Sequence, residues 1–226
     1  MKKALALISI ITSLIYLLYL CLSYKGLIRY SELYIKSPKK YINNYKKIQK
    51  FDKSKRVVIS LAPSIKDLQN IEPVIKSLLN QTVQADLISI TFLYGDKYKI
   101  PFSIKDSVAV YRTNIDYGDL NAIIPTALRE GEANTQIIAL GCDKIYGENF
   151  IEELLETSKQ NPDNIIYCNN KENKCCIKQG ILFPINIFSE EFFNCPENIN
   201  SDEWTNKFFI NKPKTKITYN LNYIKI

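Results

Sequence analysis

Carboxylates, lysines, tyrosines and cysteines are the side chains with which this chain could do chemistry, because its 226 residues include no histidine. A histidine general base, a Ser-His or Cys-His nucleophile pair and a His-ligated zinc are therefore excluded. Asp143 stands out because it lies in a short turn directly after the apolar run 136–140. An aspartate at the carboxyl end of a strand can hold a divalent cation on a phosphate, or it can simply cap the turn.

Two more acids precede the single tryptophan, Trp204. Asp202 and Glu203 are placed where a carboxylate could accept the proton of an attacking hydroxyl. Asp202 can equally be the N-cap of the helix that Trp204 marks, and Trp204 itself is more typical of a core than of a ligand platform. Asp116 and Gly118 similarly form either a plain turn or part of a ligand site.

The cysteines do not define the compartment. Five of the six follow the N-terminal apolar segment, no Cys-x-x-Cys pair is present, and an odd number argues against a complete disulfide set. The adjacent Cys175 and Cys176 lie in a Lys/Asn-rich stretch. We interpret them as ordinary thiols rather than as metal ligands.

The elements that must position these residues alternate between strand and helix, which predicts an α/β fold. Residues 56–62 form a continuous apolar run, as in a strand of a parallel sheet buried on both faces. Apolar residues at helical spacing follow over 71–79. Further strands are expected at 87–93, 107–111, 136–140, 164–168 and 216–219. Further helices are expected at 120–129, at 148–159 and around Trp204. Pro125 either kinks the first of these helices or starts a new segment. Such sheets bind ligands outside the carboxyl ends of their strands.

Charge divides the chain into two parts. Residues 1–56 have thirteen basic and two acidic side chains, a net charge of +11, whereas residues 57–226 have a net charge of −4. A nucleic-acid-binding domain would have its positive charge on the folded part, so no nucleic-acid partner is expected.

Residues 4–24 are uncharged, and as a helix they would span about 31 Å, one hydrocarbon core of a bilayer. We predict a transmembrane anchor over 1–24 rather than a cleaved signal sequence, whose apolar part is shorter. Residues 25–55 then form a basic stalk, either solvated or lying on anionic lipid, and 56–226 the folded domain. The protein is therefore expected to be a single-pass membrane protein, and its flanking lysines and arginines favour a cytoplasmic C-terminal domain.

Several segments, in order, resemble the GT-A-fold glycosyltransferases of the family 2 type. The first is Val57–Ser64 followed by Ile71–Thr82, which is similar to their opening strand and helix. Later segments resemble the second block, the aspartate motif, the acceptor-side glycine segment and the acidic-Trp motif; they are Asp116–Gly118 with Ile124–Thr126, Ile137–Tyr146, Lys178–Phe183 and Ser201–Trp204. Together they cover about residues 56–212.

The resemblance implies a GT-A-like (Rossmann-like), mostly parallel sheet flanked by helices, and a nucleotide-sugar donor. It also implies that Mn²⁺ or Mg²⁺ is held by Asp143, with Asp202, or Glu203 in its place, as the catalytic base. The donor contacts implied are Ala62, Asp116, Gly118 and Lys144.

The sequence departs from the family pattern at the donor side. The related enzymes have two or three acids where this chain has Gly141-Cys142-Asp143, and the first acid of the acidic-Trp motif is Ser201. The lysine expected after Asp-Tyr-Gly is missing, and Lys144 is a conceivable substitute.

The sequence thus favours a membrane-anchored glycosyltransferase that transfers a sugar to the hydroxyl of a glycan, lipid or protein, with inversion. The leading alternative is an inactive GT-A-fold scaffold or binding protein at the membrane. A secreted, disulfide-bonded protein is a third, weaker interpretation.

Overall fold

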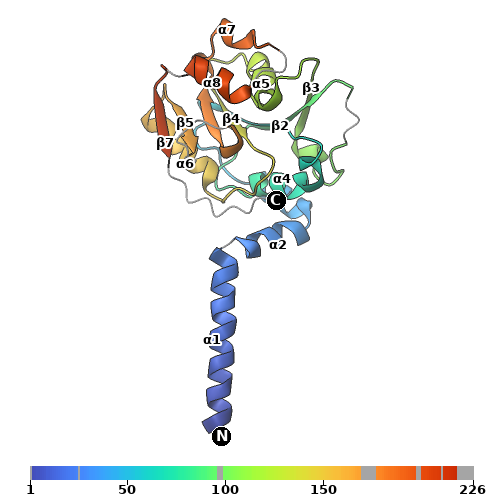
Figure 1. Ribbon diagram of the computed structural model, residues 1–226, viewed down its shortest axis with the longest axis vertical. Helices are drawn as coiled ribbons and strands as arrows, with labels where there is room; N and C mark the ends of the chain where they lie inside the picture. The colour runs from blue at the N-terminus through green and yellow to red at the C-terminus, as the bar shows by residue number, and fades with distance from the viewer. Residues whose placement is uncertain are drawn as a thin grey trace.

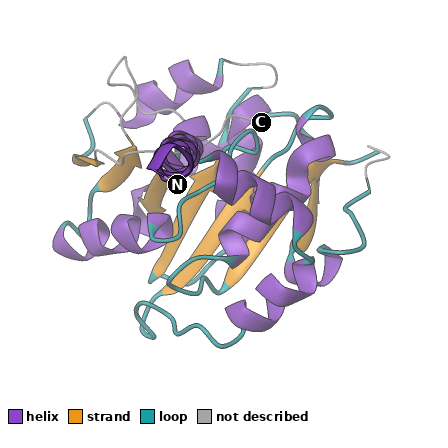
Figure 2. Cartoon of the chain, turned by 90° about the horizontal axis from the view of Figure 1, so that it is seen from below, coloured by secondary structure: helices purple, strands orange, loops and turns teal. Residues whose placement is uncertain are grey.

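The chain folds around one seven-stranded sheet with helices on its faces (Figures 1 and 2). The computed structural model describes residues 2–24, 26–95, 99–168, 177–196, 200–209 and 211–217. The strands are β1 (Arg56–Leu61), β2 (Leu87–Leu93), β3 (Ala109–Thr113), β4 (Thr135–Leu140), β5 (Ile165–Cys168), β6 (Ile181–Pro184) and β7 (Lys214–Ile217). The α-helices are α1 (Lys2–Tyr24), α2 (Leu27–Ile35), α3 (Pro38–Tyr45), α4 (Ile71–Leu79), α5 (Ile124–Arg129), α6 (Phe150–Gln160), α7 (Glu190–Phe193) and α8 (Ser201–Phe209).

The strand order is β3-β2-β1-β4-β6-β5-β7. Strand β6 is antiparallel to both of its neighbours, β4 and β5, and the other neighbouring pairs are parallel. The predicted α/β class with a mostly parallel sheet is therefore confirmed. The chain fills one side of β1 with β2 and β3 and then places β4 on the other side, so the order reverses between β1 and β4.

Alternate residues of the central strands supply two cores, as the two-residue period of a strand requires. On β4, Ile138 and Leu140 belong to the core that also contains α4 and α6. Ala139 points the other way, into a second core that is rich in aromatic rings, including Phe183, Phe192, Trp204 and Phe209. Burial on both faces explains why most residues of these strands are apolar.

Most of the expected elements appear at their predicted positions, with small shifts. Strand β3 begins two residues later than expected, and Pro125 starts a separate helix, α5, after the 3₁₀ helix η3 (Gly118–Ala122). Strand β6 was not expected as a strand. Part of the predicted last strand, 218–219, lies outside the described residues.

Residues 27–45 form two helices against the domain, α2 and α3, where a solvated or lipid-bound stalk was expected. Leu33 of α2 and Tyr41 of α3 are buried in the first core, at 1% and 6% exposure. Both helices contact α4.

Helix α1 projects away from the rest of the molecule (Figure 1). Its described side chains are exposed, and most are large and apolar. Among the described residues no single helix meets a length and hydropathy test for crossing a bilayer; Leu7–Ser23 and Leu27–Ile35 meet it together, with a bend of 76° between them. The side chains of residues 4–6 and 24, at the ends of the predicted span, lie outside the described part.

Candidate active site

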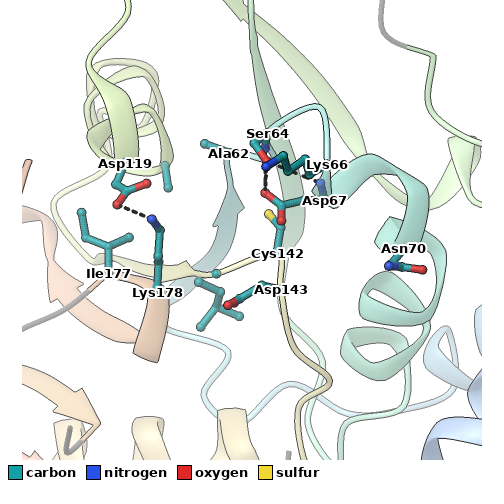
Figure 3. A pocket seen from close by; sticks show the side chains of 13 residues that line it. Ala62, Ser64, Lys66, Asp67, Asn70, Asp119, Cys142, Asp143, Ile177 and Lys178 are labelled. Atoms are coloured by element: carbon teal, nitrogen blue, oxygen red, sulfur yellow. Dashed lines mark hydrogen bonds and ion pairs between the residues drawn. The ribbon is translucent and has the colours of Figure 1, made fainter. Parts of the chain in front are cut away.

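A cavity of about 430 Å³ opens where the strand order reverses, at the carboxyl ends of β1 and β4 (Figure 3). Open α/β sheets bind ligands at such a switch point, because the loops after the two strands diverge there. The lining residues are Ala62, Ser64, Lys66, Asp67, Asn70, Asp119, Ala122, Leu140, Gly141, Cys142, Asp143, Ile177 and Lys178.

Asp143 lines this cavity, as its place after β4 predicts, and its side chain is 26% exposed. Its Oδ1 atom is buried and has no hydrogen-bond partner. The Lys144 ammonium lies 3.9 Å from that oxygen and donates a hydrogen bond to Gln179 Oε1 (3.2 Å). Since Lys144 is only 2% exposed and is not among the lining residues, its charge acts on the cavity from behind Asp143.

Cys142 occupies a position at which the resemblance leads us to expect an acid. Burial raises the pKa of its thiol well above the ordinary value, and the carboxylates of Asp67 and Asp143 raise it further. A neutral thiol is a poor ligand for a hard cation. Asp143 is therefore the one carboxylate that the described turn after β4 presents to the cavity.

The floor of the cavity depends on a close approach between two backbones. A Cβ atom on Gly141 would lie 2.7 Å from Lys178 O and 3.0 Å from Asp143 Oδ1. The Tyr146 hydroxyl donates to Gly141 O (2.8 Å). Glycine at 141 therefore allows the backbone of the 3₁₀ helix η4 (Ile177–Gln179) to pack, at Lys178, directly against the turn that carries Asp143.

Ion pairs and hydrogen bonds organise three other charged residues of the lining: Lys178, Asp119 and Asp67 (Figure 3). The ammonium of Lys178 lies 3.0 Å from the carboxylate of Asp119. Asp67 accepts hydrogen bonds from Ser64 N (2.8 Å) and Ser64 Oγ (2.7 Å), which fixes the loop after β1.

A second cavity of about 310 Å³ adjoins the first at the carboxyl ends of β1 and β2. It shares Ala62, Ser64 and Asp119 with the first cavity. Thr91 of β2 also lines it, is 2% exposed, and has a buried Oγ1 atom with no partner. A buried hydroxyl without a partner is costly, so a ligand that supplies one would bind favourably here.

Asp116 and Gly118 contribute to this second cavity through a turn. Asp116 Oδ1 accepts hydrogen bonds from Gly118 N (2.8 Å) and Asn121 Nδ2 (2.9 Å). Gly118 has a φ of 59°, and a Cβ there would lie 2.9 Å from Ser201 Oγ. Asp116 therefore stabilises a turn, as one of the two interpretations held, and it also lines the cavity.

The acidic-Trp segment forms the start of α8, against the same region. Ser201 Oγ accepts a hydrogen bond from Asp119 N (3.1 Å) and donates one to Tyr117 O (3.2 Å). Glu203 is exposed and does not line either cavity, and the side chain of Asp202 lies outside the described residues. Trp204 is 8% exposed and donates to Phe192 O (3.2 Å), so it is a core residue.

The structure thus brings Ala62, Asp116, Gly118 and Asp143 to the two cavities, with Lys144 behind them. Sequence reasoning missed four charged lining residues: Lys66, Asp67, Asp119 and Lys178. Lys66 and Asp67 directly follow the end of β1, so their place after a buried parallel strand was a usable signal. Lys178 had no such signal, because η4 reaches the cavity only through tertiary packing. The adjacent Cys175 and Cys176 lie outside the described residues.

The comparisons with known proteins show that this chain shares its fold with several solved structures. No protein-family model matches the sequence, and no curated protein matches it. Among solved structures, 4-diphosphocytidyl-2C-methyl-D-erythritol synthase from Anaerococcus prevotii DSM 20548 matches with a TM-score of 0.52 at 8% identity, over 76% of this chain and 90% of that one. HddC from Yersinia pseudotuberculosis matches with a TM-score of 0.53 at 14% identity, over 76% and 93%.

A third similar structure is S. aureus TarS 1-349, with a TM-score of 0.54 at 9% identity, over 74% of this chain and 59% of that one. These likenesses cover most of this chain at very low identity, so they show architecture alone. They do not single out the family 2 glycosyltransferases. The chain has a GT-A-like α/β fold in the broad sense.

Proposed function

We propose that this protein is a transferase that binds a nucleotide-linked sugar by its diphosphate and transfers the sugar to an acceptor hydroxyl. The observation that carries the proposal is the cavity at the β1–β4 switch point, which Asp143 lines with a carboxylate whose buried Oδ1 atom has no hydrogen-bond partner. The similar solved structures support a nucleotide-linked substrate through fold alone.

The charges of the lining favour a divalent cation as part of the donor site. The lining contains three aspartates and two lysines, a net charge of −1, and the nearly buried Lys144 brings the local sum to zero. A diphosphate adds about two negative charges, which such a site does not neutralise by itself. Mn²⁺ or Mg²⁺ bound with the donor would supply that charge and stabilise the leaving diphosphate.

Asp143 is the residue that would hold the cation. No group of three or more His, Cys, Asp or Glu side chains suited to a metal occurs among the described residues. Mg²⁺ at phosphate sites, however, commonly uses only one or two protein carboxylates, with phosphate and water as the other ligands. A single aspartate therefore fits a cation that arrives with its nucleotide, and it does not fit a permanently bound metal.

The remaining roles follow from position. Lys178 and Lys66 attract the diphosphate, and Thr91, Asp116 and Asn121 in the adjoining cavity offer polar groups to the nucleoside. Asp202 accepts the proton of the acceptor hydroxyl; its support is that Ser201 ties the first turn of α8 to the backbone of Asp119. Attack by that hydroxyl on the anomeric carbon inverts its configuration.

Helix α1 anchors the protein in a membrane in this proposal. Its large apolar side chains are exposed, and the hydroxyls of Thr12 and Ser13 bond within the helix. Thr12 Oγ1 donates to Ile8 O (3.0 Å) and Ser13 Oγ to Ser9 O (2.9 Å), as polar groups in hydrocarbon must.

An inactive binding protein is the second candidate. The neutral, buried thiol of Cys142 at an expected acid position favours it, because one carboxylate holds a cation more weakly than two.

Ligand-induced stabilisation of the full chain in detergent separates the two candidates. A nucleotide sugar at about 100 times its Kd adds about 2.7 kcal/mol, which raises Tm by about 5–10 °C in a chain of this size. We expect this shift with UDP- or GDP-sugars plus Mn²⁺ and a much smaller one without the metal. Asp143→Ala should abolish the metal-dependent part. The matched control, Asp106→Ala, changes an exposed aspartate at the amino end of β3 and should leave the shift intact.

If the shift occurs but no sugar is transferred to any acceptor, the chain is the binding protein. If no nucleotide sugar shifts Tm with or without metal, both candidates fail.

A further inference from the structure

Helix α2 is fixed to the domain by one face. Leu33 is 1% exposed and belongs to the first core. Arg29 donates hydrogen bonds to Tyr146 O (3.0 Å) and to the Glu148 carboxylate (2.5 Å), both in the loop before α6. The contacts of this face are enough to hold α2 on the protein.

The opposite face of α2 is also apolar, and its large side chains are exposed among the residues that the structure describes; Tyr34 stacks only on Tyr30 of the same helix. Leu27, Tyr34 and Ile35 are 39%, 64% and 79% exposed, and Ser31 between them is exposed as well. Positions i, i+4, i+7 and i+8 lie on one side of a helix. Burial of the inward face therefore leaves an outward strip of Leu27, Ser31, Tyr34 and Ile35, which we call the outer strip.

Two neighbours of the outer strip indicate what covers it. It follows α1 directly after Gly26, whose φ of 69° allows the sharp change of direction, and the two helices are bent by 76°. Beyond its other end lie three lysines: Lys36, Lys39 and Lys40. A helix with an apolar strip and basic neighbours is the pattern of an element that lies in a membrane interface.

We infer that α2 lies flat on an anionic bilayer surface, with the outer strip in the interface and the three lysines at the lipid headgroups. This inference rests on the proposed anchoring by α1, since a helix bent by 76° from a membrane-crossing one runs nearly along the surface. Through Arg29 and Leu33, α2 would hold the domain at a fixed orientation to the membrane, which a flexible stalk cannot do (Figure 1).

Tryptophan quenching by brominated lipid tests the inference on the full chain. The single native tryptophan is removed by Trp204→Phe, and one reporter is added at a time: Ile35→Trp in the outer strip, Leu14→Trp in α1, or Leu128→Trp. Leu128 is 61% exposed on α5, which lies at the end of the molecule far from α1 (Figure 1). The vesicles contain phosphatidylglycerol and a phosphatidylcholine brominated near the headgroup end of its chains.

We expect the Ile35→Trp emission to fall about twofold or more, as for an interfacial helix, while Leu128→Trp is unchanged. Quenching of Leu14→Trp without quenching of Ile35→Trp would leave the anchor intact and overturn the inference. Absence of quenching at both sites would overturn the anchor as well. If Trp204→Phe does not fold, the same differences are taken relative to the wild-type chain.

The charge component has its own control. Lys39→Glu with Lys40→Glu should reduce quenching of Ile35→Trp in anionic vesicles and leave that of Leu14→Trp unchanged. The matched control, Lys105→Glu, reverses an exposed lysine of a different element, η2 (Lys105–Ser107). If the Ile35→Trp spectrum instead depends on protein concentration and not on lipid, the strip binds a second copy and the inference fails.

Discussion

Gly141 is the residue on which the shape of the candidate site most depends. Replacing it by alanine places a methyl group 2.7 Å from a backbone oxygen, which cannot move without shifting η4. We expect Gly141→Ala to lower the free energy of unfolding by about 1–3 kcal/mol, as overpacking of a closed site does. Nucleotide-sugar binding should weaken with it, because Lys178 is displaced.

Gly131 supplies the control for that measurement. A Cβ on Gly131 meets nothing within 4 Å, so Gly131→Ala should be neutral or slightly stabilising in the same urea titration. Equal losses from the two variants would show that Gly141 has no special packing role.

At the same scale, the sequence was sufficient to predict Asp143 but not the charges around it. Asp143 follows a buried strand directly, and topology alone places such a residue at the ligand edge. The pairing of Asp119 with Lys178 joins residues far apart in the chain, through η3 and η4, and no local pattern encodes it. Metal coordination by Asp143 and the base role of Asp202 remain predictions.

At the scale of elements, the phenol of Tyr45 ties helix α3 to the segment that precedes β2. Tyr45 OH accepts a hydrogen bond from Ala85 N (2.8 Å) and donates one to Ala85 O (3.2 Å), and burial raises the pKa of Tyr45 to about 12. The unfolded chain releases this proton near pH 10, and the folded chain does so only near pH 12. The contribution of Tyr45 to the free energy of unfolding is therefore fully present below pH 10. As the pH rises to 12 this contribution is lost, by up to about 2.7 kcal/mol.

Tyr45→Phe isolates this effect from the other groups that titrate in alkali. The variant should be less stable at pH 8, because Ala85 N loses its acceptor, and its stability should fall less steeply between pH 9 and 11. The difference between the two urea curves at each pH measures the Tyr45 contribution. Parallel pH dependences would show that the phenol is not held protonated by the fold.

Helix α2 should contribute to folding through Leu33. Truncating this fully buried side chain by Leu33→Ala should cost about 2–5 kcal/mol, as for other buried leucines. Leu128→Ala, at an exposed leucine of α5, should change stability by less than about 0.5 kcal/mol. If both variants unfold at the same urea concentration as the wild type, α2 is not part of the cooperative unit.

The elements that the sequence predicted best are those whose burial is complete. Strands β1, β2 and β4 are covered on both faces, so most of their residues are apolar and each run is easily recognised in the sequence. Strand β6 has only four residues and ends at Pro184, so it is too short to show the two-residue alternation by which a strand is recognised in a sequence. Helices α2 and α3 have nine and eight residues and bury one residue each, so the basic residues in and around them led to the prediction of a stalk.

At the scale of the whole molecule, α1 and the charges at its ends determine on which side of a membrane the domain would lie. Lys2 and Lys3 precede the apolar run, and five basic residues follow it within sixteen positions: Lys25, Arg29, Lys36, Lys39 and Lys40. The side with more lysine and arginine near the span is usually cytoplasmic, so we predict a cytoplasmic domain.

Protease added to sealed right-side-out membranes should then leave the domain intact, and protease added to inverted vesicles should digest it. Adding four lysines after Met1 should shift part of the population to the opposite protection pattern, whereas four glutamines there should not. Digestion of the wild-type domain from the outer side would refute this topology and leave the fold and its cavity unaffected.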